Sequence, residues 1–263
     1  MAVKESDVHH AHDTQNVHDT RTDREHWQLR RWSHNVKSSF QKAWATQPQQ
    51  AWRPWLITLV IGWIICAGLM VGMAIGIRAL EGTSVLAWER PWMQSFIEAS
   101  PLSITKVLYL GLPAHTLSVT FVMALATVIA ILQRRPFDAM SISFGVVLMT
   151  CIVFLGWQVA ARDRPDLVLN GALAPGFHSF PSGHVAHSTI LYGLLTYFWV
   201  RQTQHWGERM LAIILCVLLL LSISAGRLLE GAHWPTDILA SYVIGGAWLA
   251  VVITALRRLP QRV

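Results

Sequence analysis

The chain has 263 residues, of which 53% are hydrophobic and only 14% are charged, and its formal net charge is +6. A soluble domain carries about a quarter charged residues, so this composition excludes an ordinary soluble protein and indicates an integral membrane protein. The positive charge is concentrated in short segments between apolar stretches. We therefore expect the lipid bilayer, and no nucleic acid, as its partner.

Residues 1–50 differ from the rest of the chain because they are polar, charged and rich in histidine. The histidines are His9, His10, His12, His18, His26 and His34. This composition predicts a cytoplasmic tail that is disordered or partly helical at the membrane surface. A metal-binding histidine tract is the alternative interpretation.

Charge-free stretches dominate the remainder. They cover residues 54–77, 117–132, 139–161, 185–200, 210–225 and 238–256. A membrane-spanning helix needs roughly 20 apolar residues, and the shorter stretches reach this length with their polar flanks or with support from neighbouring helices. The sequence therefore predicts an all-α, polytopic fold with six transmembrane helices, in a membrane domain of residues 51–258.

Arginines mark one side of the membrane. They are Arg30, Arg31, Arg53, Arg134, Arg135, Arg201, Arg209, Arg257, Arg258 and Arg262. The positive-inside rule places them in the cytoplasm, together with both termini and a short C-terminal tail of residues 259–263. Connections 78–116, 162–184 and 226–237 then face the other side. Trp and Leu residues in the first of these connections predict a short interfacial helix.

The tetrapeptide Pro181-Ser182-Gly183-His184 stands where the second outer connection turns into the fourth predicted span. Free backbone N–H groups and the dipole at a helix start favour an anion, so Ser182 to His184 are candidate phosphate donors. A capped helix with an interfacial histidine explains the same residues. This motif alone does not decide between the two interpretations.

The third outer connection runs from Arg227 through His233 to Asp237. A carboxylate there can hold one imidazole nitrogen as N–H and leave the other as a nucleophile, although Asp237 could also be a plain helix cap. Arg164, before Pro165, adds a guanidinium that can bind phosphate oxygens bidentately. The predicted topology brings all these side chains to one membrane face.

Together these motifs resemble the type 2 phosphatidic acid phosphatase (PAP2) superfamily of integral-membrane lipid phosphatases. The family pattern is Lys-x6-Arg-Pro, then Pro-Ser-Gly-His, then Ser-Arg-x5-His-x3-Asp, and the resemblance covers about residues 54–256. Two positions depart from it, because Trp157 stands at the lysine and Gly226 at the serine that precedes Arg227. Arg162 is a candidate replacement for the missing cation.

The resemblance implies that His233 attacks phosphorus and forms a phosphohistidine, and that Asp237 orients it. His184 would protonate the leaving oxygen and then activate water. The groups that would hold the phosphoryl oxygens are Arg164, Arg227, Ser182, the Gly183 backbone and, as a further candidate, Arg162. The family implies no metal and no other cofactor.

The expected substrate is a membrane lipid whose phosphate lies at the headgroup level. Undecaprenyl diphosphate or a related prenyl phosphate is the first choice, and phosphatidic acid or phosphatidylglycerol phosphate the next. The motifs recognise phosphate and not the lipid tail, so they leave this choice open, as they do the oligomeric state. A lipid phosphotransferase and a non-catalytic lipid-binding relative are the alternatives. The expected location is a bacterial inner membrane, with the site facing the periplasm.

Overall fold

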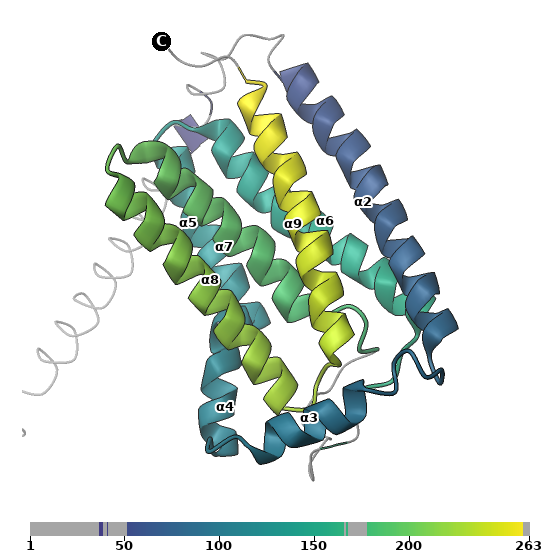
Figure 1. Cartoon of the computed structure of the whole chain (residues 1–263). Coiled ribbons are helices and arrows are strands. Elements are labelled where there is room, and N and C mark those ends of the chain that lie inside the picture. The colour runs from purple at the N-terminus through teal and green to yellow at the C-terminus, as the bar shows by residue number, and fades with distance from the viewer. Residues whose placement is uncertain (1–36, 39–40, 42–51, 166, 168–177, 260–263) are drawn as a thin grey trace, which may run out of the picture.

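The computed structural model describes residues 37–38, 41, 52–165, 167 and 178–259, and within these ranges every regular element is a helix. The long helices are α2 (Trp52–Leu80), α5 (Thr116–Leu132), α6 (Pro136–Ala160), α7 (Gly183–Gln202), α8 (Trp206–Leu229) and α9 (Pro235–Arg257). They form one bundle (Figure 1). The shorter elements are α3 (Glu89–Glu98), α4 (Ile104–Gly111) and the 3-10 helix η1 (Leu112–Ala114). The all-α prediction is confirmed.

Five stretches of the described chain are long and apolar enough to cross a membrane. They are Trp52–Leu80, Ile104–Leu132, Pro136–Ala160, Trp206–Leu229 and Pro235–Arg257, the second of which joins α4, η1 and α5. Helix α7, which contains the fourth predicted span, is not among them. Its first turns carry His184, His187 and Ser188, which lower its hydropathy. The count of six spans and the cytoplasmic termini stay predictions.

The predicted terminal tails fall almost entirely outside the described residues. Of the tail 1–50, only residues 37–38 and 41 are described, and of the tail 259–263 only residue 259. The predicted interfacial helix lies in a stretch that the structure does describe, where α3 and α4 occupy most of the connection between α2 and α5. This stretch lies at one end of the bundle (Figure 1).

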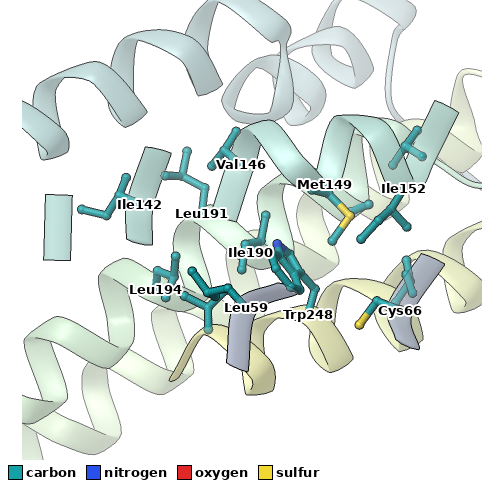
Figure 2. Packing of buried hydrophobic residues seen from close by; sticks show 14 of the residues in the cluster. Leu59, Cys66, Ile142, Val146, Met149, Ile152, Ile190, Leu191, Leu194 and Trp248 are labelled. Atoms are coloured by element: carbon teal, nitrogen blue, oxygen red, sulfur yellow. The ribbon is translucent and has the colours of Figure 1, made fainter. Parts of the chain in front are cut away.

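The apolar core is formed mainly by α2, α6, α7 and α9. Figure 2 shows its centre, where the labelled side chains are Leu59, Cys66, Ile142, Val146, Met149, Ile152, Ile190, Leu191, Leu194 and Trp248. Helices that associate in a bilayer gain little from burying apolar surface, so close packing and interhelical hydrogen bonds must hold them together. Both are present in this core.

Three indole N–H groups tie α6 to its neighbours. The donor–acceptor pairs are Trp55 Nε1 to Ser141 Oγ (3.1 Å), Trp63 Nε1 to Leu148 O (3.1 Å) and Trp248 Nε1 to Gly145 O (2.8 Å). The first two donors belong to α2 and the third to α9. These bonds fix α6 between α2 and α9, and so they also fix where the chain leaves α6 at residue 161.

Helices α7 and α9 approach each other closely through glycine. A Cβ atom added at Gly245 would lie 2.8 Å from Thr189 Cβ, which is closer than side chains tolerate. Both helices begin at the end of the bundle where α6 and α8 finish (Figure 1). The three sequence motifs therefore meet at one end of the molecule, and α3 lies beneath that end (Figure 1).

Candidate active site

His233 is buried in the short turn between α8 and α9, and its ring has a defined tautomer. Its Nδ1 lies 2.7 Å from the carbonyl oxygen of Ser179, which can only accept a hydrogen bond. The proton of the neutral imidazole must therefore be on Nδ1, and the lone pair on Nε2. Asp237 Oδ2 lies 3.7 Å from Nδ1, beyond hydrogen-bond distance, and acts on the ring through its charge.

The protonation state of His233 follows from its surroundings. Burial lowers the pKa of His233 below its usual 6.5, and the neighbouring carboxylate of Asp237 opposes this shift. The nearby charges of Arg164 and Arg227 lower the pKa further. The imidazole is therefore neutral near neutral pH, as a nitrogen nucleophile must be.

Asp237 is fully buried, and both of its oxygens are bonded. Oδ2 accepts the backbone N–H of Trp234 at 2.8 Å, which caps the start of α9. Oδ1 accepts a hydrogen bond from Arg162 Nη1 at 2.7 Å. The carboxylate thus fixes the turn that carries His233, while the Ser179 carbonyl holds the ring nitrogen. A backbone carbonyl has no side-chain signature, so this contact could not be predicted from the sequence.

The start of α7 is bonded to the start of α9 through Ser241. The backbone N–H of Ser182 donates to Ser241 Oγ at 2.8 Å, and Ser241 Oγ donates to the Asp237 carbonyl at 2.6 Å. The hydroxyl of Ser182 is buried and has no hydrogen-bond partner among the described residues. Buried polar groups are almost always bonded, so this hydroxyl is a candidate ligand contact.

Trp157 occupies the position where the family has lysine, and it contacts the same loop. Its indole N–H donates to the Pro181 carbonyl at 3.0 Å. A Cβ atom added at Gly183 would lie 3.4 Å from its ring, so the loop packs directly against the indole. The tryptophan thus supports the loop mechanically where a lysine would supply charge.

Arg164 and Arg227 each have an unused donor. Arg164 Nη1 donates to the Ala232 carbonyl at 2.7 Å, and the Nε atoms of both arginines are buried without a partner among the described residues. Burial lowers the pKa of Arg164, and the charge of Asp237 opposes this shift. Both guanidinium groups therefore keep hydrogen-bonding capacity for an anion beside His233.

Arg227 also connects two groups whose pairing the sequence did not reveal. Its Nη2 forms an ion pair with Glu230, and its Nη1 lies 3.2 Å from His184 Nε2. A guanidinium only donates, so His184 Nε2 accepts this bond. The Glu230 side chain is only 10% exposed, so this ion pair is largely shielded from solvent.

Arg162 differs from Arg164 and Arg227 in pairing with two carboxylates. Its terminal nitrogens donate to Asp237 and Glu89, and its side chain is buried. It therefore holds carboxylates, which leaves only its Nε atom without a partner among the described residues. Within the same ranges, no group of three or more His, Cys, Asp or Glu side chains is placed to hold a metal ion.

The arrangement has the parts for chemistry on an oxyanion. Two guanidinium groups and a hydroxyl offer buried donors, a neutral imidazole offers a nucleophilic nitrogen, and a second imidazole, that of His184, lies against one guanidinium. Positioned donors and cations stabilise the charge that develops when a nucleophile attacks phosphorus.

Comparisons with known proteins bear on the family and the fold. The family model of the PAP2 superfamily matches residues 139–260, which confirms the family expected from the motifs. No curated protein matches the chain. Among solved structures, a transmembrane PAP2 type phosphatidylglycerolphosphate phosphatase from Bacillus subtilis matches with a TM-score of 0.63 and 15% identity, over 80% of this chain and 98% of that one. At this identity the match shows a common fold.

Proposed function

Because residues 139–260 form a PAP2 superfamily domain in a bundle with the fold of a transmembrane member, we propose that this multi-pass membrane protein hydrolyses a lipid phosphate through a phosphohistidine on His233. One observation carries the proposal. The buried Nε atoms of Arg164 and Arg227 and the hydroxyl of Ser182 have no partner in the described chain, beside a histidine whose Nε2 holds a lone pair. Donors left unpaired in this way fit a phosphoryl group.

In the first half-reaction, His233 Nε2 attacks phosphorus. The N–P bond forms as the P–O bond to the lipid breaks, and the leaving oxygen takes a proton from His184. Phosphate binding draws Arg227 away from His184 Nε2, and that nitrogen then takes up from solvent the proton that it passes to the leaving oxygen. The hydrogen bond from Nδ1 to the Ser179 carbonyl and the charge of Asp237 stabilise the positive imidazole that develops at His233.

In the second half-reaction, water attacks the phosphohistidine. The water proton passes to His184, the N–P bond breaks, and the lone pair returns to His233 Nε2. The net reaction converts the lipid phosphate and water into the dephosphorylated lipid and phosphate. Arg164, Arg227, Ser182 and the Gly183 backbone hold the phosphoryl oxygens in both steps, because the transition state spreads charge over all of them.

Undecaprenyl diphosphate or a related prenyl phosphate remains the first candidate substrate. Phosphatidylglycerol phosphate and phosphatidic acid follow, and the name of the matching Bacillus subtilis protein supports the former. The placement of the arginines supports a site on the face opposite the cytoplasm, which is the periplasmic face if the protein lies in a bacterial inner membrane.

The test is phosphate release by the full-length, detergent-purified protein from undecaprenyl diphosphate, phosphatidylglycerol phosphate and phosphatidic acid, with excess EDTA. We expect release from at least one lipid, and a loss of about a thousandfold or more in His233→Ala, because the nucleophile is removed. His205→Ala is the matched control, since His205 is exposed at the start of α8, at the opposite end of the bundle.

Two other results would contradict hydrolysis through His233. Release that His233→Ala leaves intact would exclude the phosphohistidine. Product formation that depends on an added lipid acceptor would identify a phosphotransferase. If the folded protein hydrolyses none of these lipids, Trp157→Lys restores the cation of the family pattern. Activity that appears only in this variant would identify the natural chain as a non-catalytic relative.

A further inference from the structure

Glu89 is a buried acid far in sequence from every motif described above. It is the first residue of α3, lies outside the matched region 139–260, and is only 1% exposed. An uncompensated carboxylate in such a place is costly, so its partners show what it does. Its side chain bonds to Thr236 at the start of α9 and to Arg162, which in turn bonds to Asp237.

The first set of bonds joins Glu89 to Thr236. Glu89 Oε1 accepts the backbone N–H of Thr236 at 3.1 Å and its hydroxyl at 2.7 Å. Thr236 directly precedes Asp237 in the first turn of α9. One carboxylate oxygen therefore anchors the backbone that carries Asp237.

The second set of bonds runs through Arg162. Its Nη2 pairs with Glu89 Oε2, and its Nη1 donates to Asp237 Oδ1 at 2.7 Å and to Thr236 Oγ1 at 2.8 Å. The guanidinium carbon lies 5.2 Å from the centre of the Trp234 ring, which covers its face. Arg162 is therefore a rigid bridge between two carboxylates.

The charges in this network matter for His233. Two carboxylates share one guanidinium, so in the ionised state the group carries one excess negative charge, next to an imidazole that becomes positive when Nε2 is bonded to phosphorus. Without Glu89, the positive charge of Arg162 would offset only the negative charge of Asp237. The electrostatic effect of Asp237 on the His233 ring would then be weaker. A low local dielectric strengthens such effects.

We propose that Glu89 is a positioning residue for Asp237 and His233 that acts through Arg162. The expected loss of kcat rests on the proposed function. The coupling of Glu89 to the His233 imidazole does not depend on that function. It makes α3 part of the active unit, although α3 lies outside the matched family region and beneath the bundle end that carries the site (Figure 1). It also gives Arg162 a role other than binding phosphate.

The experiment compares Glu89→Gln, Arg162→Gln and the double variant with the full-length protein in detergent. Glu89→Gln should lower kcat for phosphate release about ten- to a hundredfold and change KM less than about threefold, because positioning is lost and substrate contacts are kept. The double variant should be within about twofold of Arg162→Gln, because Glu89 acts through that arginine. Glu98→Gln is the matched control, since Glu98 is exposed at the other end of α3.

A second readout does not depend on turnover. The ring nitrogen-15 chemical shifts of His233, identified by their loss in His233→Ala, should change in Glu89→Gln and stay unchanged in Glu98→Gln. If Glu89→Gln changes the His233 signals but the protein hydrolyses no lipid, the proposed function is contradicted and the coupling between Glu89 and His233 stands. Failure of the function and failure of the coupling are therefore distinguishable.

A merely structural Glu89 gives a different pattern. Glu89→Gln would then lower the melting temperature, with kcat per folded molecule and the His233 signals unchanged, and the proposal would be overturned. Losses that add fully in the double variant would overturn the route through Arg162. Should Glu89→Gln not fold, Thr236→Val removes the bridging hydroxyl and keeps all three charges. It should lower kcat without raising KM, and an unchanged kcat would overturn the proposal.

Discussion

The two ends of the bundle use the same residue types in different ways. At the site end, Arg162 lies between Asp237 and Glu89, and all three side chains are at most 4% exposed. At the opposite end, Arg201 pairs with Asp138 at 2.5 Å, but the arginine side chain is 37% exposed. The first group fixes the turn that carries His233, and the second joins the end of α7 to the start of α6.

Both ends contain ion pairs, so the presence of an ion pair does not distinguish them. The difference lies in how deeply the charged side chains are buried. A buried charge must be matched by fixed partners, so removing one partner disturbs the others. An exposed pair exchanges its partner for water and contributes about 0–1 kcal/mol. Variants at the two ends should therefore differ in how strongly they affect phosphate release.

The largest effect should come from crowding the loop before α7. A Cβ atom at Gly156 would lie 2.5 Å from Pro181 Cδ and 2.7 Å from Met70 Sδ, and the proline ring cannot move without shifting Ser182. Gly156→Ala should therefore lower kcat/KM for phosphate release about tenfold or more. Gly72→Ala is the control, because nothing lies within 4 Å of a Cβ there. Equal activity in the two variants would show that the loop position does not matter.

The next effect concerns pH. Burial lowers the pKa of His233 below 6.5, so the nucleophile stays neutral as the pH falls to that value. Once substrate ionisation is measured by phosphorus NMR and divided out, kcat/KM should change less than about twofold between pH 7.5 and 6.5. The decrease in kcat/KM should begin only below pH 6.5, the usual pKa of histidine. An enzyme-derived acid limb centred at or above pH 6.5 would contradict a buried, neutral His233.

The smallest effect should come from the opposite end. Asp138→Asn removes the charge that pairs with Arg201, and phosphate release should stay unchanged because, among the described residues, no hydrogen bond or ion pair joins this pair to the site. The melting temperature should fall by about 4 °C or less, because the introduced asparagine keeps a polar group beside the half-exposed Arg201 side chain. A loss of activity comparable to that of Glu89→Gln would show that the two ends are not energetically separate.

Much of the fold could be predicted because it depends on local composition. Charge-free stretches predicted the long helices, and the motif spacing predicted the family that the comparison confirmed. Helix α7 shows the limit of this reasoning. Its polar first turns carry site residues, so it falls below the hydropathy of an ordinary span even though it packs in the bundle core.

The site was less predictable where contacts connect distant segments or involve backbone atoms. Glu89 and Arg162 are 73 residues apart, and nothing in either segment reveals the pair. The Ser179 carbonyl that holds His233 carries no side-chain information. Trp157 was visible as a departure from the family pattern, but its bond to the Pro181 carbonyl was not.

Composition, hydropathy and motif spacing alone indicated an all-helical membrane protein, together with the histidines, arginines and aspartate that match the motif pattern of a known family. Hydropathy and motif spacing are properties of the linear chain, so they can be read without a structure. Only the tertiary structure decided which partner each charge takes. Arg162 binds two carboxylates, whereas Arg164 donates to a backbone carbonyl, because helix packing sets which groups meet, and at buried positions that choice determines each residue's chemistry.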